Sequence, residues 1–200
     1  GIMALTDQVW PSDNSDPFDR LSIQHGFSLA YPASTMVAWV TAAPHWVNRR
    51  NTSLYYRFLS AMQGALGVGD NLNAWDARHV EVAAQLIAAY KHVRELEQRG
   101  DLYRLISPLN GSDRSATLYV APDRARAVLF GFLHSSTRLH SQPRIRLAGL
   151  DPTRNYRMRN ITDGPDADGP VRSGAYWMGQ GVDLTMRGDF QAAARVFEAA

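Results

Sequence analysis

A group of carboxyl and amide side chains near the start of the chain could carry acid–base chemistry. Asp13, Asn14, Asp16 and Asp19 all fall within residues 8–20, which read QVWPSDNSDPFDR. A carboxyl group can give a proton to a departing oxygen when burial or a neighbouring charge raises its pKa toward the working pH. Asp13 follows an apolar segment and precedes a helix start, where the strand-to-helix loops of α/β barrels carry catalytic residues. Asp13 is therefore the candidate proton donor.

Two other interpretations of this cluster stand beside the catalytic one. Asp, Asn and Ser favour turns and helix N-caps because their short polar side chains bond to nearby backbone groups, and we assign Asp16 and Asp19 to this role. For Asp13, residue type alone favours the same turn interpretation. A calcium loop is the third possibility, but the spacing lacks the central glycine and closing glutamate of the usual pattern.

Some neighbouring side chains are candidates for substrate contact. Trp10 and Asn14 flank Asp13, and the flat indole face of Trp10 suits the apolar face of a hexose, although most tryptophans are core or interface residues. We take both as candidate substrate-binding residues. His45 and Arg50 lie in the segment APHWVNRR, which has neither helical nor strand periodicity. Such a loop could position a substrate hydroxyl or hold another loop in place, and a histidine that is hydrogen-bonded for structure is the commoner case.

The elements that must position Asp13 are a strand before it and a helix after it. Residues 4–10 (ALTDQVW) are typical of a short strand. Asp16 as N-cap, Pro17 at the first helical position and Gly26 as a stop predict a helix over 17–25.

Two more helices are predicted before the composition changes near Gly100. One should start after Thr52 or Ser53 and stop at Gly67, because apolar residues recur there every four positions. The other should run from Asp76 to Arg99 along an apolar stripe. A lone strand is not a sheet, so this first part of the chain is expected to be the end of something larger.

The second half predicts an antiparallel β-domain. Turn-rich stretches separate short apolar or alternating runs, a pattern typical of an antiparallel sandwich or sheet. The predicted strands are LYRLI, ATLYV, AVLFGFL, RIRLAGL, NYRMRNI, AYWM and VDLTM. The expected domains are therefore residues 1–99 and 100–200.

Composition excludes several function classes. With 45% hydrophobic residues, 20% charged residues and a formal net charge of +2, the chain is typical of a globular protein and does not call for nucleic acid. No apolar run is long enough to span a membrane, and the first ten residues do not read as a signal peptide. Phosphate-binding loops and G-x-S-x-G elbows are absent from the sequence. The lack of cysteine suits a cytoplasmic and a secreted protein equally.

No metal site or cofactor is predicted. The chain has no cysteine to supply thiolate ligands. The histidines outside the segment APHWVNRR show no metal-ligand spacing of the H-x-x-x-H type. They are His25, His79, His92, His134 and His140.

The sequence resembles family 36 glycoside hydrolases, the α-galactosidases of the melibiase type. The W-x-S-D-N-x-D motif around Asp13 carries the resemblance, which continues through LFGFLHSS, LAGLDPTRNYRMR and SGAYWMGQGVDLTMRGDFQAA. It covers essentially the whole chain. Two departures stand out: the family commonly has a histidine where this chain has Trp39, and PNHQTGR where residues 44–50 read PHWVNRR.

The resemblance implies a C-terminal fragment of a (β/α)₈ barrel, comprising its last strand and helices, followed by an antiparallel β-sandwich domain. In that pattern Asp13 is the general acid/base of a retaining α-galactosidase, and the nucleophile is an aspartate in an upstream K-W-D motif that this chain lacks. The implied partner is an α-galactoside oligosaccharide, with assembly of the intact enzyme into a homo-oligomer. Because residues 44–50 depart from PNHQTGR, the resemblance does not by itself assign a site role to His45 or Arg50.

A different class of function also fits the residues. The β-domain could be a carbohydrate-binding or oligomer-assembly module without catalysis. Binding of an oligosaccharide to the chain without residues 1–99 would favour that alternative.

Overall fold

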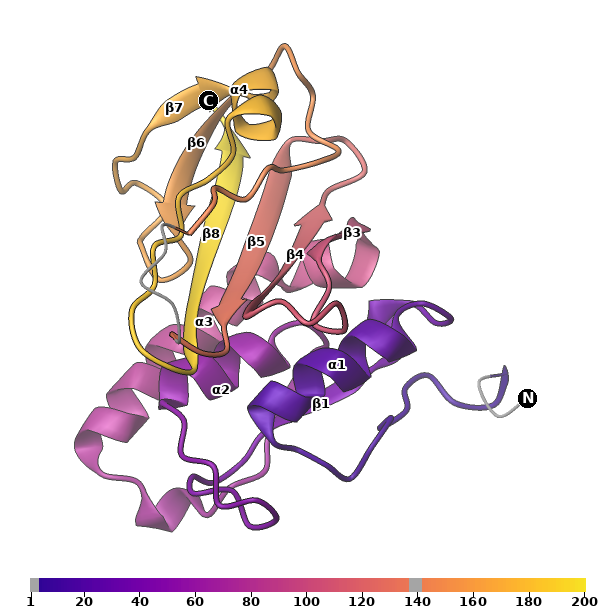
Figure 1. The fold of residues 1–200 in the computed structure, drawn as a ribbon, viewed down its shortest axis with the longest axis vertical. Helices are drawn as coiled ribbons and strands as arrows, with labels where there is room; N and C mark the ends of the chain where they lie inside the picture. Colours follow the sequence, from indigo (N-terminus) through magenta and orange to yellow (C-terminus); the bar gives the residue numbers. More distant parts are fainter. Residues whose placement is uncertain (1–3, 137–141) are drawn as a thin grey trace. The chain divides into compact units, whose positions relative to one another are not determined.

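The computed structural model describes residues 4–136 and 142–200 and divides the chain into two compact units, Gly1–Gln98 and Arg99–Ala200. Figure 1 shows helices with a small parallel sheet in the first unit and a larger antiparallel sheet in the second. No helix in these described ranges combines the length and the apolar character needed to cross a membrane.

The first unit contains more strand than the sequence predicted. Strand β1 (Val37–Val40) pairs in parallel with β2 (Ala65–Val68), and Val9 forms a parallel bridge with Met36, just ahead of β1. Of the expected strand over residues 4–10, only Val9 pairs within the described chain. Strands β1 and β2 were missed because four-residue apolar runs are too short to show a period. The barrel-end architecture is confirmed, with more strands than expected.

Helix α1 (Pro17–Phe27) begins as predicted. The Asp16 side chain caps it by accepting hydrogen bonds from the backbone N–H groups of Phe18 and Asp19, at 3.1 and 2.9 Å. It satisfies two of the donors that a helix start otherwise leaves open. Helix α1 connects Val9 to the next parallel segment, which is the crossover that parallel pairing requires.

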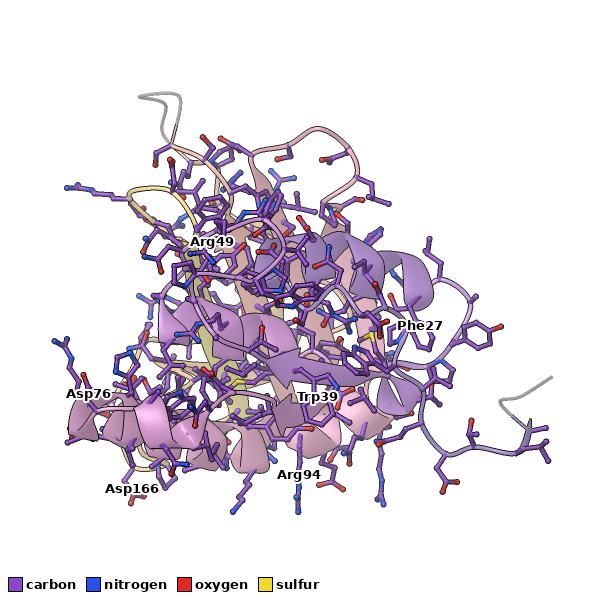
Figure 2. All side chains as sticks on the ribbon, turned by 90° about the horizontal axis from the view of Figure 1, so that it is seen from below. Phe27, Trp39, Arg49, Asp76, Arg94 and Asp166 are labelled. Atoms are coloured by element: carbon purple, nitrogen blue, oxygen red, sulfur yellow. The ribbon has the colours of Figure 1, made fainter. Side chains whose placement is uncertain are left out.

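Helix α2 (Leu54–Ala61) is shorter than predicted. Its N-cap is Ser53, as expected, but the helix ends well before Gly67, which belongs to β2. Residue 67 is a glycine for a different reason from the one predicted. A Cβ on Gly67 would lie 2.5 Å from the ring of Trp39, the indole labelled in Figure 2. Gly67 therefore leaves room for an aromatic ring on the neighbouring strand and is not a helix stop.

Helix α3 (Ala77–Arg99) confirms the third helix prediction. Its Tyr90 hydroxyl donates to the carbonyl of Gly64 and accepts from the N–H of Leu66, both at 3.2 Å, so the helix is tied to the start of β2. Glu97 on this helix is only 2% exposed. Burial raises the pKa of its carboxyl to about 8, because the charged form loses its hydration.

The second unit is built on one six-stranded antiparallel sheet in the order β3-β4-β5-β8-β6-β7. The C-terminal strand β8 lies inside the sheet, between β5 and β6, and ties the end of the unit to its middle. The strands are β3 (Asp101–Ile106), β4 (Arg114–Val120), β5 (Arg126–Leu133), β6 (Asn155–Asn160), β7 (Val171–Ser173) and β8 (Gln191–Ala199).

The antiparallel β-domain is confirmed, although some strand predictions are wrong. RIRLAGL and VDLTM are irregular and share a single antiparallel bridge between Ile145 and Val182, whereas AYWM lies in helix α4 (Gly174–Gly179). Ser173 starts that helix by accepting from the N–H of Tyr176 at 3.2 Å. The apolar residues of these segments were misread because they face the core without joining a ladder.

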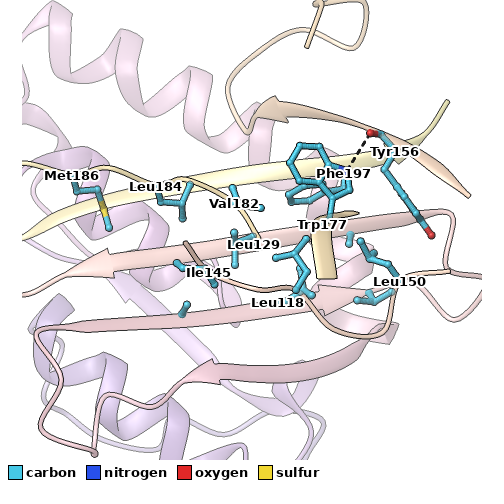
Figure 3. Packing of buried hydrophobic residues seen from close by; sticks show 14 of the residues in the cluster. Leu118, Leu129, Ile145, Leu150, Tyr156, Trp177, Val182, Leu184, Met186 and Phe197 are labelled. Carbon is cyan, nitrogen blue, oxygen red and sulfur yellow. Dashed lines mark hydrogen bonds between the residues drawn. The ribbon is translucent and has the colours of Figure 1, made fainter. Parts of the chain in front are cut away.

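The irregular segments and α4 form the second layer of this domain, over one face of the sheet. Leu118 and Leu129 from the sheet pack in one cluster with Ile145, Trp177 and Leu184 (Figure 3). Trp177, 4% exposed, meets the ring of Phe197 edge-on, with centroids 5.5 Å apart. Each such buried side chain contributes about 1.5–3 kcal/mol relative to exposure. Trp177 is therefore a structural residue of this core.

Candidate functional site

The segment between Val9 and α1 carries the predicted acid, Asp13, and both predicted substrate-binding residues, Trp10 and Asn14. Trp10 is 49% exposed, and Asp13 is exposed at the turn of what we call the Asp13 loop, residues 12–16. The Asp13 carboxylate makes no hydrogen bond or ion pair within the described parts of the chain. No bond within the described parts of the chain therefore commits the Asp13 carboxylate to a structural role.

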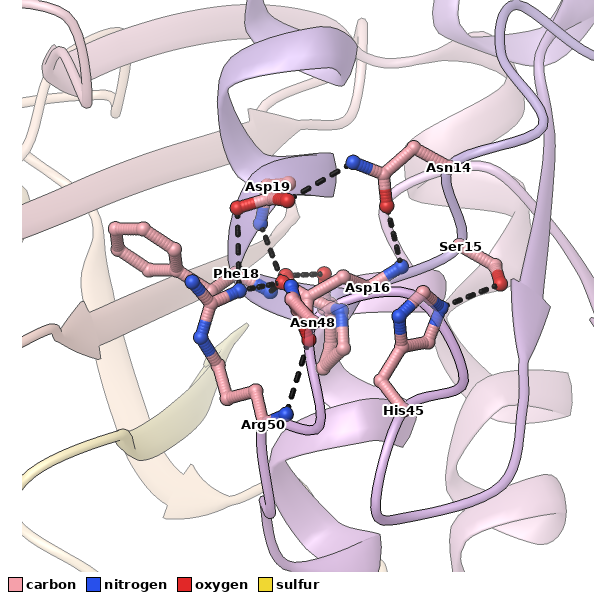
Figure 4. A network of polar contacts seen from close by, with 10 residues as sticks. Asn14, Ser15, Asp16, Phe18, Asp19, His45, Asn48 and Arg50 are labelled. Carbon is pink, nitrogen blue, oxygen red and sulfur yellow. Dashed lines mark hydrogen bonds and ion pairs between the residues drawn. The ribbon is translucent and has the colours of Figure 1, made fainter.

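The Asn14 side chain serves the loop itself. Its amide oxygen accepts from the N–H of Asp16 at 3.0 Å, and its amide nitrogen donates to Oδ2 of Asp19 at 2.8 Å (Figure 4). The Asn14 backbone N–H donates to Oγ of Ser12 at 3.1 Å. These bonds span both sides of Asp13, so the turn is braced locally.

An ion pair between the buried Asp16 and the partly exposed Arg50 supports the loop. Asp16 is fully buried, and one of its carboxylate oxygens caps α1 while also accepting from Nη1 of Arg50. The same Arg50 nitrogen lies 3.1 Å from Oδ1 of Asp19. The guanidinium also lies 4.7 Å from the centroid of the Phe18 ring. Through these contacts Asp16 and Asp19 have structural roles, and the cap interpretation of Asp16 agrees with this.

A histidine supports the loop from a second direction. His45 is 1% exposed, and its Nε2 lies 3.1 Å from Oγ of Ser15. Ser15 was not singled out from the sequence. His45 and Arg50 were considered as residues of a loop that could hold another loop in place, and these contacts are of that kind.

A third support comes from α1 and was missed. Arg20 is 2% exposed, and its guanidinium donates to the carbonyls of Ser12 at 3.4 Å and Val37 at 3.1 Å. Burial lowers its pKa to about 10. An arginine on the buried face of an amphipathic helix is the signal that would have found it, since such residues are almost never fully buried without partners.

Trp10 lies beside Trp39, the residue at which the chain departs from the resembling family. Their ring centroids are 5.9 Å apart, at an angle of 56°. The indole N–H of Trp39 is buried and has no hydrogen-bond partner among the described residues. Trp10 remains 49% exposed beside this contact, and a sugar-stacking role requires an accessible ring.

Arg49 adopts a backbone conformation that favours glycine. Its φ is 59°, in the left-handed region. Arg49 stands where the resembling PNHQTGR pattern has glycine. Because the Cβ of an L-residue crowds the next carbonyl there, Arg49→Gly should raise the free energy of unfolding by up to about 1 kcal/mol.

Urea unfolding of the chain measures this effect, with Arg49→Ala as the matched control. Alanine removes the guanidinium but keeps the Cβ, so it should bring no gain. Equal stabilities of the two variants would contradict the conformational explanation.

The second unit holds a cavity of about 510 Å³ that bears on the alternative function. Its lining combines Arg114, Arg144, Arg146 and Gln180 with aliphatic side chains and a proline. None of the lining residues is aromatic, so the cavity lacks the stacking surface expected of a sugar-binding module. The described residues also contain no cluster of His, Cys, Asp or Glu that could hold a metal ion, and His140 lies outside them.

Comparison with known proteins identifies the relatives of this chain. The Melibiase family model matches residues 1–100, and the model of the Glycosyl hydrolase family 36 C-terminal domain matches residues 114–197. Probable alpha-galactosidase G of Aspergillus terreus is 36% identical over 191 residues, covering 95% of this chain and 25% of the relative. Alpha-galactosidase Mel36A of Lactobacillus acidophilus is 34% identical over 202 residues, covering 100% and 26%.

Solved structures agree with the sequence comparison. A variant of the family 36 α-galactosidase AgaA from Geobacillus stearothermophilus, in complex with raffinose, superposes with a TM-score of 0.92 at 33% identity and covers 100% of this chain and 27% of its own. AgaB from the same organism gives 0.91 at 34%, with the same coverage. This chain thus spans about a quarter of the length of its relatives. Since the Melibiase model matches half of its residues, the chain belongs to the melibiase family, family 36 of the glycoside hydrolases.

Proposed function

We propose that this chain is the C-terminal part of a retaining α-galactosidase that hydrolyses terminal α-galactosides. Residues 1–99 form the end of the catalytic barrel, and residues 100–200 form the C-terminal β-domain. The observation that carries the proposal is the Asp13 loop. Its other polar side chains are engaged within the described chain, whereas the exposed Asp13 carboxylate is left free.

Asp13 acts in two steps. A retaining mechanism uses two carboxyl groups about 5–5.5 Å apart, of which one attacks the anomeric carbon and the other handles the proton. Protonated Asp13 gives its proton to the glycosidic oxygen as the nucleophile's bond to the sugar forms and the aglycone departs. Asp13, now a carboxylate, takes a proton from the water that attacks the same carbon and releases galactose and the nucleophile.

The substrate class comes from the relatives. Structures of AgaA variants hold raffinose and stachyose, so we assign α-galactoside oligosaccharides of that type to this protein. The aglycone leaves next to the acid, and we expect Trp10, which is half-exposed and three residues before Asp13, to contact it. The nucleophile is supplied from the part of the barrel upstream of residue 1.

The test is hydrolysis by two proteins in parallel: the 200-residue chain, and the enzyme extended upstream to a full barrel. The extended enzyme should cleave an aryl α-galactoside and raffinose, and proton NMR should show α-galactose as the first product. The 200-residue chain should cleave neither, because one carboxyl cannot run the two-step mechanism. An inactive extended enzyme, β-galactose as first product, or turnover by the chain alone would each refute part of the proposal.

A further inference from the structure

We infer that the segment His45–Arg50 is a positioning device for the catalytic acid, with Arg50 and His45 as its two anchors. This inference rests on the proposed function of Asp13. Neither anchor contacts Asp13 itself among the described residues. Each acts through a neighbour of Asp13 in the loop: Arg50 through Asp16, and His45 through Ser15.

The Asp13 loop needs outside support because its own attachment is thin. On the strand side the described chain holds it by a single bridge at Val9 and by the 3.4 Å bond from Arg20 to the carbonyl of Ser12, and on the helix side it runs into the start of α1. A catalytic acid must nonetheless sit precisely, since a displacement of about 1 Å can cost on the order of 10²-fold in rate. A free carboxylate at the tip of a short loop gains that precision only from what holds its neighbours.

The Arg50 anchor holds the loop directly at Asp16 and indirectly at Asn14, through Asp19. Its Nη1 contacts Asp16, which follows the turn, and lies 3.1 Å from Oδ1 of Asp19. The other oxygen of Asp19 accepts from the Asn14 side-chain amide at 2.8 Å, and Asn14 directly follows Asp13 in the chain. Arg50 therefore holds the Asp19 carboxylate, and that carboxylate holds Asn14, the residue next to Asp13. If Arg50 only balanced the charge of the helix cap, the contact with Asp16 alone would suffice.

The His45 anchor holds the loop between these two points. The contact of 3.1 Å joins Nε2 of His45 to Oγ of Ser15, and both residues are buried. Side chains locked by burial keep their rotamers, which makes them effective supports for a site.

Backbone bonds join the two anchors to each other. The His45 N–H donates to the carbonyl of Arg50 at 2.9 Å, and the Arg49 N–H donates to the carbonyl of His45 at 2.8 Å. The Asn48 side chain accepts from the N–H of Arg50 at 3.0 Å. The segment is thus a closed turn that contacts the Asp13 loop at Ser15 and at Asp16. Trp46, within the same turn, is 71% exposed.

The experiment compares two leaving groups in the extended enzyme. Raffinose needs a proton on its departing oxygen, whereas 2,4-dinitrophenyl α-galactoside has a leaving group acidic enough to depart without one. If Arg50 positions the acid, Arg50→Met should lower kcat/KM for raffinose by about 10²-fold and leave kcat/KM for the dinitrophenyl substrate little changed. Arg50→Lys should recover part of the loss, because it keeps the charge but not the planar fork.

Three further variants are assayed beside Arg50→Met. Arg159→Met removes a buried arginine that pairs with Glu198 in the second unit, and should leave the ratio of the two rates unchanged. His45→Gln tests the second anchor should Arg50→Met fail to fold. Asp13→Asn, assayed alongside, shows whether proton donation resides there at all.

The outcomes separate the inference from the proposed function. Selective loss with raffinose in the Asp13 and Arg50 or His45 variants supports both. Selective loss in Asp13→Asn alone, with equal losses or none on the two substrates in the anchor variants, overturns the positioning role and leaves the proposed function standing. No selectivity in Asp13→Asn overturns the proposed function.

Discussion

Replacing Asp13 by asparagine in the extended enzyme should lower kcat/KM for raffinose by about 10³-fold. Asparagine has the shape of aspartate but cannot give up a proton at neutral pH, so the departing oxygen must leave as an anion. The loss should shrink steadily as the leaving group becomes more acidic, and a series of aryl α-galactosides measures that trend. Stability should change little, because Asp13 is exposed and makes no bond within the described chain.

Azide gives this prediction a second readout. In Asp13→Ala the second step lacks a general base, so the galactosyl enzyme should accumulate on substrates with good leaving groups. Azide needs no base, so it should restore turnover and yield the α-galactosyl azide. Asp7→Asn, an exposed aspartate before the loop, is the matched control and should behave as wild type. Equal losses of kcat/KM across all leaving groups, with no azide product, would mean that Asp13 is only a turn residue.

Glu97→Gln should stabilise the chain, increasingly so as the pH rises. Burial raises the pKa of the Glu97 carboxyl from 4.5 to about 8, and neither oxygen has a hydrogen-bond partner among the described residues. Between these values the unfolded chain is ionised and the folded chain is protonated. The protonated Glu97 side chain therefore contributes its full share to the free energy of unfolding of the wild type below pH 4.5, and this share is lost as the pH rises toward 8. By about pH 8.5 the glutamine variant should be more stable than wild type by roughly 3–5 kcal/mol.

Urea unfolding at several pH values tests this prediction. The difference between Glu97→Gln and wild type should be small near pH 5 and grow toward pH 8.5. Glu95→Gln, on the same helix but exposed, should show no such growth. The Glu97 carboxyl carbon can also be titrated directly by NMR, with the variant providing its assignment. A difference that stays constant over the pH range would mean that the buried carboxyl is not the cause.

Local signals in the sequence were sufficient wherever a short segment decides its own structure. The Asp16 cap with Pro17 predicted the start of α1, and the long apolar stripe predicted α3 almost to the residue. Strands β4 and β5 were predicted because both combine β-branched and aromatic residues between turn signals. These features depend on neighbours within a few positions along the chain.

Predictions failed where distant contacts overrule local preference. Gly67 was read as a helix stop, but it is a strand residue that makes room for Trp39. AYWM was read as a strand, but the Ser173 cap and the burial of Trp177 against Phe197 make it part of α4. A run of apolar residues does not specify which element it belongs to until its packing partner is known.

The sequence by itself determined the family resemblance, the candidate acid Asp13, the caps and the division into helical and β segments, because motifs and caps act over a few adjacent residues. Only the tertiary structure decided how the Asp13 loop is held. Arg50 and Asp16 lie 34 positions apart along the chain, and His45 and Ser15 lie 30 apart. Their pairing depends on the parallel arrangement of Val9 and β1, which places the segments that follow them side by side. Contacts of that kind arise from the folding of the whole unit, and no short pattern encodes them.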